Sequence, residues 1–152
     1  MTLAPEKIED LIPHAGRMCL LERVLAWSDD QIHCETTSHG WSDNPLRRSG
    51  RLAGIHLIEY GAQAMAVHGA LLARTRGETL AGGYLAALRG ITLRCAHIHE
   101  LTGSIRVGAR RLAAVDGNLM YSFDVHHGER CLAEGRVTVA SLRAPPHKAF
   151  QS

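Results

Sequence analysis

The sequence lacks several features that would place the chain in a specialised class. Its 17 Lys and Arg nearly balance its 15 Asp and Glu, so the formal net charge is only +2. This balance argues against the strongly basic surface that nucleic-acid binding requires, and no nucleic-acid partner is expected. The longest apolar segment, Leu52 to Ala73, contains Glu59, Gln63 and His68, so no membrane-spanning helix is expected either.

The cysteines are too few for a small disulfide-stabilised scaffold, and no two of them form a C-x-x-C pair. They are Cys19, Cys34, Cys95 and Cys131. Each lies in a segment that is predicted to be a strand or the edge of one, so reduced thiols fit best. Met1 to Asp10 carries acids and no apolar run, so we expect no signal peptide. Together these observations predict a cytoplasmic protein.

The length of 152 residues is usual for one domain and is sufficient to bury a core. We expect a single domain over residues 1–143. Residues 144–152 contain two prolines and little apolar content, which predicts a loose C-terminal tail.

The segment Leu52 to Ala73 predicts one long helix. Its apolar residues recur at the i, i+3, i+4 spacing of a helix with one buried stripe. The predicted stripe consists of Ile55, Ile58, Ala62, Met65, Ala66, Gly69 and Leu72. Glu59 falls within this stripe, Gln63 follows one turn later, and Gly54 lies near the helix start. A carboxylate at a position where burial would be costly suggests a function.

Segments that resemble strands surround the helix in the sequence. A strand that begins within Arg17 to Trp27 and the alternating segment Gln31 to Thr37 predict a hairpin. Four further strands follow the helix, and short turns between them predict an antiparallel meander. These strands are Tyr84 to Cys95, Ser104 to Leu112, Leu119 to His126 and Cys131 to Ala140.

One long helix among antiparallel strands can bury its stripe only if the sheet wraps around it. The sequence therefore predicts an α+β hotdog fold, a curved antiparallel sheet around one central helix. Such a sheet has an edge strand, and pairing of edges between two subunits would cover it. We therefore expect a dimer or a higher oligomer of hotdog chains.

Several short motifs, taken in order, resemble those of the hotdog-fold 3-hydroxyacyl-[acyl-carrier-protein] dehydratases. They are Pro13-His14 before Leu20-Leu21-Glu22-Arg23-Val24, the helix pattern Gly54-Ile55-x-x-x-Glu59-x-x-x-Gln63, a turn at Gly103, and Leu132-Ala133-Glu134-Gly135 in the last strand. The likeness covers most of residues 8 to 140. It is closest to the divergent branch associated with aryl polyene and related pigment pathways.

The resemblance implies that the chain dehydrates a 3-hydroxyacyl thioester on acyl carrier protein to the 2-enoyl thioester, without a metal or an organic cofactor. This reaction needs a base for the proton next to the carbonyl and an acid for the departing hydroxyl. Glu59, if desolvated, is the expected acid, and Gln63 is expected to hold its carboxyl by a hydrogen bond. The backbone N–H near Gly54 is expected to stabilise the negative charge on the carbonyl oxygen.

The base is harder to place, because this chain departs from the family pattern of a His-x-x-x-x-Pro loop and a Pro-Gly pair at the helix start. An ungapped count places Pro45 at the histidine position, and Ala53 replaces the proline. His39 is the best substitute and requires a longer loop here. His56, three residues before Glu59, is the alternative source of an imidazole.

The segment Ser38 to Arg51 reads as a long functional loop. Its arginines, Arg47, Arg48 and Arg51, are expected to attract an acidic carrier protein or its phosphopantetheine phosphate. His97-x-His99 and His126-His127 suggest a metal site. No metal is expected, however, because no Cys or acid lies at ligand spacing.

Two other functions are compatible with the same residues. In a hotdog thioesterase, Glu59 would activate water and no histidine would be needed. Alternatively, the chain would be a catalytically silent subunit that pairs with an active dehydratase as a heteromer.

Overall fold

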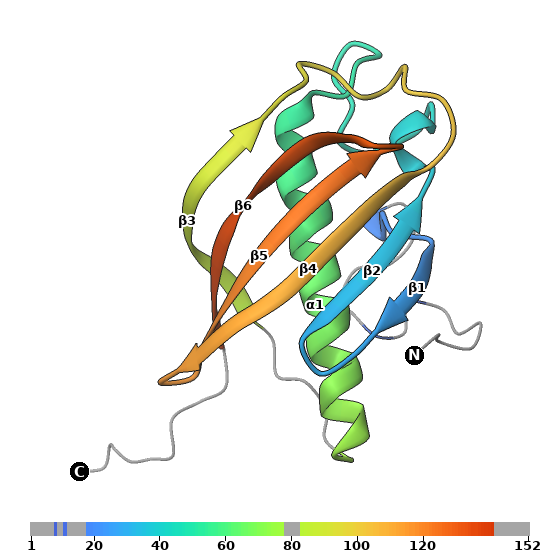
Figure 1. Ribbon diagram of the computed structural model, residues 1–152. Helices are drawn as coiled ribbons and strands as arrows, with labels where there is room; N and C mark the ends of the chain where they lie inside the picture. The colour runs from blue at the N-terminus through green and yellow to red at the C-terminus, as the bar shows by residue number, and fades with distance from the viewer. Residues whose placement is uncertain (1–7, 9–10, 12–17, 78–82, 142–152) are drawn as a thin grey trace.

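The computed structural model describes residues 8, 11, 18–77 and 83–141. In this part of the chain, one six-stranded antiparallel sheet curves around one long helix, which confirms the predicted arrangement (Figure 1). The elements are β1 (Arg23–Trp27), β2 (Gln31–Thr36), the 3-10 helices η3 (Ser38–Gly40) and η4 (Gly54–His56), α1 (Leu57–Thr75), β3 (Gly83–Leu93), β4 (Ile105–Val115), β5 (Asn118–His127) and β6 (Arg130–Ser141). The predicted tail at 144–152 lies outside the described residues.

The strand order is β1-β2-β4-β5-β6-β3, and all neighbours are antiparallel. The predicted hairpin of β1 and β2 is confirmed, as is the meander from β4 to β6. The meander also predicted that β3 pairs with β4, and this is wrong. Instead, β3 pairs with β6 at the far edge of the sheet, and β4 pairs with β2. The connection from β3 to β4 is a loop rather than a tight turn, so it leaves β4 free to cross to β2.

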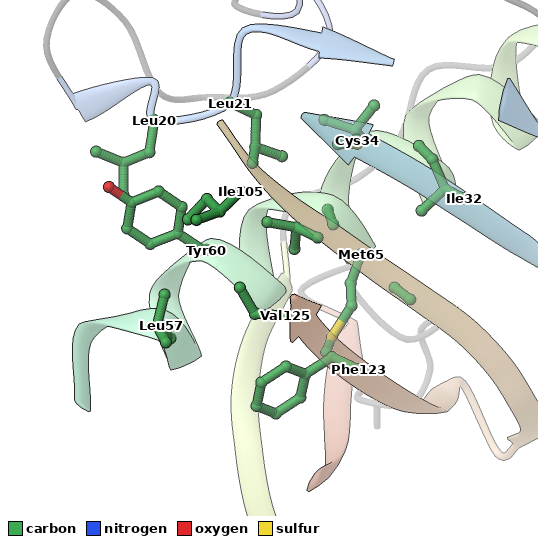
Figure 2. Packing of buried hydrophobic residues seen from close by; sticks show 14 of the residues in the cluster. Leu20, Leu21, Ile32, Cys34, Leu57, Tyr60, Met65, Ile105, Phe123 and Val125 are labelled. Carbon is green, nitrogen blue, oxygen red and sulfur yellow. The ribbon is translucent and has the colours of Figure 1, made fainter. Parts of the chain in front are cut away.

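Helix α1 packs against β2, β4 and β5 with a different face from the one predicted. Of the predicted stripe, Met65 and Leu72 are buried, whereas Ile55 is 57% exposed and the other members are only half-buried. The side that enters the core carries Leu57, Tyr60, Ala64, Val67 and Leu71. Figure 2 shows Tyr60 beside Leu20 and Ile105 in this core, with Leu57 on the same helix. The sequence did not distinguish the faces, because small apolar residues continue around the helix.

The strand β3 leaves apolar surface uncovered at the edge of the sheet. Leu85, Leu88 and Leu93 are 40%, 45% and 38% exposed, and we refer to these three residues as the β3 leucines. They share the strand with an unpaired row of backbone groups, because β3 has only β6 as a neighbour. An edge strand of this kind is a template for pairing with a second chain. No helix in the described ranges is long and apolar enough to span a membrane.

His68 is a buried polar residue of α1, and both of its ring nitrogens have hydrogen-bond partners. Its Nε2 lies 2.8 Å from the carbonyl oxygen of Ser28, and its Nδ1 lies 2.7 Å from the hydroxyl of Tyr121. Burial raises the pKa of Tyr121 to about 12, so this hydroxyl stays protonated and donates to Nδ1. Nε2 then carries the hydrogen that the Ser28 carbonyl accepts. The pair therefore fixes a neutral histidine in the core.

Acid is expected to destabilise the fold through His68. Burial lowers the pKa of His68 from its ordinary 6.5, so the unfolded chain takes up this proton at a higher pH than the folded chain. The stability contributed by His68 is complete above pH 6.5 and is lost as the pH falls towards the folded pKa, by at most about 1.4 kcal/mol per pH unit. Urea unfolding between about pH 7 and about pH 5 measures this slope. In the variant His68→Gln the slope should be smaller, and an unchanged slope would refute the assignment.

Candidate functional site

His39 lies in η3, directly after β2, and its side chain is buried with 1% exposure. Its Nε2 lies 3.0 Å from the carbonyl oxygen of Leu101, and its Nδ1 has no hydrogen-bond partner in the described part of the chain. A carbonyl oxygen only accepts hydrogen bonds, so Nε2 carries the hydrogen and Nδ1 keeps its lone pair. The loop thus holds the His39 imidazole in the tautomer in which Nδ1 can accept a proton.

The surroundings of His39 favour its neutral form. Burial is the main cause that lowers its pKa, and the charges of His127 and Arg47 act in the same direction. The hydrogen bond to Leu101 and the negative charge of Glu22 oppose this shift without cancelling it. The imidazole is therefore neutral at pH 7 and competent to accept a proton.

A buried polar cluster fixes the loop that carries His39 against α1. The Ser38 hydroxyl lies 2.9 Å from the Tyr60 hydroxyl, and the Asn44 amide donates to the Ser38 carbonyl at 2.9 Å and to the Tyr60 hydroxyl at 3.2 Å. Glu22 supports the same loop by accepting from the backbone N–H and the hydroxyl of Thr37. These positioning groups were not predicted from the sequence. The polar Ser38 and Asn44 within the loop were the signal that could have indicated them.

Glu59 lies in the first turn of α1 and is half-buried. Gln63, one turn later, donates to the Glu59 carboxylate at 3.2 Å and to the Met18 carbonyl at 2.7 Å, while its side-chain oxygen accepts from the Leu20 N–H at 2.9 Å. The expected contact between Gln63 and Glu59 is therefore present. Gln63 has a second task that the sequence did not reveal, because it ties α1 to the segment that leads into β1.

The two candidate groups are held by separate sets of contacts. The carboxylate whose charge acts on His39 is that of Glu22, whereas Glu59 is bonded to Gln63. Tyr60, the neighbour of Glu59 in sequence, reaches Ser38 and so links the helix to the loop. The alternative base His56 ends η4 and is half-buried.

Gly54 has a packing role that the sequence did not reveal. Its N–H already donates to the Ala96 carbonyl at 2.8 Å, so this N–H is occupied within the chain. A Cβ atom at this position would lie 2.1 Å from the Cys95 carbonyl oxygen. The close approach of the segment after β3 therefore requires a glycine at this position.

The three arginines of the loop form a tight turn near the start of η4. Arg48 and Arg51 exchange backbone hydrogen bonds of 2.8 and 3.0 Å and have exposed side chains. The turn residues Ser49 and Gly50 have φ values of 52° and 75°. Arg47 is half-buried, and its guanidinium donates to the Gly50 carbonyl at 2.8 Å. The Arg48 guanidinium also donates to the Arg47 carbonyl at 3.0 Å, so the turn presents two exposed positive side chains while Arg47 and Arg48 both donate hydrogen bonds within it.

The histidines outside the loop have structural contacts. His99 accepts from the Leu52 N–H at 3.1 Å and stacks edge-on against His97. His126 lies 3.2 Å from the Asp124 carboxylate, and His127 lies 2.6 Å from the Thr102 carbonyl. In the ranges that the structure describes, no three His, Cys, Asp or Glu side chains gather into a group that would hold a metal.

The curved antiparallel sheet around one long helix defines a hotdog-fold protein. A family model described as ApeP dehydratase matches residues 6–151, so the chain belongs to the ApeP-like dehydratase family. The resemblance seen in the sequence is thereby confirmed. No curated protein matches the chain.

Solved structures agree on the fold. The dehydratase heterocomplex ApeI:P from Xenorhabdus doucetiae matches with a TM-score of 0.80 and 23% identity over 91% of this chain and 92% of that chain. A putative esterase from Mycobacterium tuberculosis matches with a TM-score of 0.61 and 13% identity over 89% and 100%. A thioesterase from Staphylococcus aureus matches with a TM-score of 0.54 and 14% identity over 77% and 89%. At these identities the likeness shows the fold alone.

Proposed function

We propose that the chain catalyses the dehydration of a 3-hydroxyacyl thioester on acyl carrier protein to the 2-enoyl thioester. The observation that carries the proposal is His39, a buried and neutral imidazole whose Nδ1 lone pair has no partner among the residues that the structure describes. A buried nitrogen without a partner is costly unless a ligand or a reaction uses it. Membership of a dehydratase family supports the same reaction.

In the proposed reaction, Nδ1 of His39 removes a proton from the carbon next to the thioester carbonyl. The electron pair of the broken C–H bond forms the double bond, and the C–O bond to the hydroxyl breaks. Glu59 acts as the acid and gives a proton to the departing hydroxyl, which leaves as water. The thioester bond remains intact, and no redox change occurs. Gln63 orients the Glu59 carboxyl, because the two side chains share a hydrogen bond of 3.2 Å.

The proposed partners are a carrier protein and a second hotdog chain. The exposed Arg48 and Arg51 suit an acidic carrier protein and the phosphate of its phosphopantetheine arm. The uncovered β3 edge and the β3 leucines suit a second chain. A similar structure is that of a dehydratase heterocomplex, which supports a second hotdog protein of different sequence as the partner. We further propose that this complex works in the cytoplasm.

The test is to incubate the purified chain, alone and together with a co-expressed hotdog partner, with a 3-hydroxyacyl carrier protein. Intact-protein mass spectrometry then distinguishes the possible products. Loss of one water from the loaded carrier is the expected result. A thioesterase would instead release the hydroxy acid and leave the unloaded carrier, which would contradict the proposal. A loaded carrier that stays unchanged in both samples would also contradict it.

A further inference from the structure

The outer face of the sheet, opposite α1, contains a hollow that the dehydration chemistry does not use. Its volume is about 710 Å³, within the range of small-ligand sites. Side chains on a strand alternate between the two faces, and Phe123 contacts α1 at Gly61, so Ser122 and Asp124 face outwards into this hollow. The site around His39 lies beyond the end of β2 and does not contribute to it.

One row of residues crosses five strands at this hollow. Register pairs join Gln31 to Arg110, Arg110 to Ser122, Ser122 to Arg136 and Arg136 to Arg89. We call these five residues the arginine row. Arg136 and Arg89 are direct cross-strand neighbours, and like charges in such a pair destabilise a sheet. Strands lie about 4.8 Å apart, so the arginines span about 15 Å of the sheet.

The neighbouring row carries acids, but each has a partner of its own. The Glu134 carboxylate pairs with Arg94 at 2.6 Å, and the Asp124 carboxylate lies 3.2 Å from His126. Among the described residues, no carboxylate forms an ion pair with Arg89, Arg110 or Arg136. Three positive charges therefore line the hollow without an ion-pair partner among the described residues.

The backbone also shapes the hollow for a ligand. Gly108 lies between Asp124 and His33, two residues that line the hollow, and a Cβ there would lie 2.7 Å from the Asp124 carboxylate. The register of β3 shifts between Arg89 and Thr92, and Gly90 there has a φ of 58°. A bulge of this kind re-aims the side chains around it. It places Arg89 and Gly90 in the wall of the hollow.

We propose that the arginine row binds a small organic phosphate that carries two or more negative charges. Guanidinium groups recognise phosphate oxygens in bidentate geometry, and the Ser122 hydroxyl adds a neutral donor between Arg110 and Arg136. At the end of the row, the Gln31 side-chain oxygen accepts from the Arg110 guanidinium at 3.4 Å. A nucleoside diphosphate has the charge and the size for this hollow. The inference does not depend on the proposed dehydration.

The test measures binding of ADP and of inorganic pyrophosphate to the full chain by calorimetry and by thermal shift. Both variants Arg136→Gln and Arg110→Gln should weaken binding at least about tenfold, since each removes a charge-assisted contact. The matched control is Arg106→Gln, which removes an exposed arginine from the same strand as Arg110, four residues away on the same face. It should bind as the unaltered chain does.

A second readout comes from the unliganded protein. Arg136→Gln should melt at the same temperature as the unaltered chain or higher, because it removes one of two facing like charges. At the same time it should lose the stabilisation by ADP. The proposal is overturned if neither probe binds at millimolar concentration, or if Arg106→Gln weakens binding as much as Arg136→Gln does.

Discussion

Replacing His39 by alanine is expected to lower kcat for dehydration by a factor of about 10² to 10⁴, the usual contribution of a positioned general base. The imidazole is neutral, buried and held by the Leu101 carbonyl, and alanine has no group that could accept the proton in its place. The measurement is the rate of enoyl formation on the carrier protein, with circular dichroism to establish that the variant is folded.

The matched control is His56→Ala, which removes the other imidazole near the start of α1. This variant should retain the rate within a few-fold. If His56→Ala rather than His39→Ala abolishes dehydration, the base is misassigned. If a complex that contains the His39→Ala chain keeps its full rate, this chain is a silent subunit and the proposed role of His39 is wrong.

Replacing Gly54 by alanine should lower the free energy of unfolding by about 1–3 kcal/mol or more, as overpacking of a tight contact does. The added Cβ would lie 2.1 Å from the Cys95 carbonyl oxygen, a backbone atom that cannot rotate away as a flexible side chain would. Relief requires the segment after β3 to move, which strains the hydrogen bond from Gly54 to Ala96. Urea unfolding with a comparison of midpoints and slopes measures the loss.

Gly40→Ala is the control for this experiment, because a Cβ at Gly40 meets no atom within 4 Å. Its stability should stay close to that of the unaltered chain. Equal stability of the two variants would show that the glycine at 54 is not required for packing.

The existence of the long helix followed from the sequence, whereas its buried face did not. Apolar periodicity finds a helix, but Ala62, Ala66 and Gly69 continue the apolar surface onto the side that the sheet leaves half-exposed. The true core side includes Gln63 and His68, which sequence patterns treat as polar. Their burial is possible because backbone and tyrosine partners satisfy them, and these partners are distant in sequence.

The strands were also predictable as segments, whereas the position of β3 was not. Alternation and turn residues act over a few positions, so they located β3 to β6 within three residues at each end. The choice of β6 as the neighbour of β3 depends on the path of the chain around α1. Patterns of a few neighbouring residues do not determine that path.

The candidate site was predictable in its helical half. Glu59 and Gln63 are four residues apart on one helix, so their hydrogen bond follows from spacing. The other half depends on contacts across the fold, in which Leu101, Asn44 and Tyr60 hold the loop of His39. The residue type and position of His39 indicated it as a candidate base. The groups that bury and orient it could not be predicted, because they come from other parts of the chain.

The hydrogen bond between His39 and Leu101 joins residues 62 positions apart, which has a consequence for the order of events during folding. Closing so long a loop costs chain entropy and comes later than the formation of hairpins. The nitrogen that we propose as the proton acceptor is therefore defined only after β2 has paired with β4 and the chain beyond Leu101 has been synthesised. On refolding, recovery of activity should lag behind recovery of secondary structure.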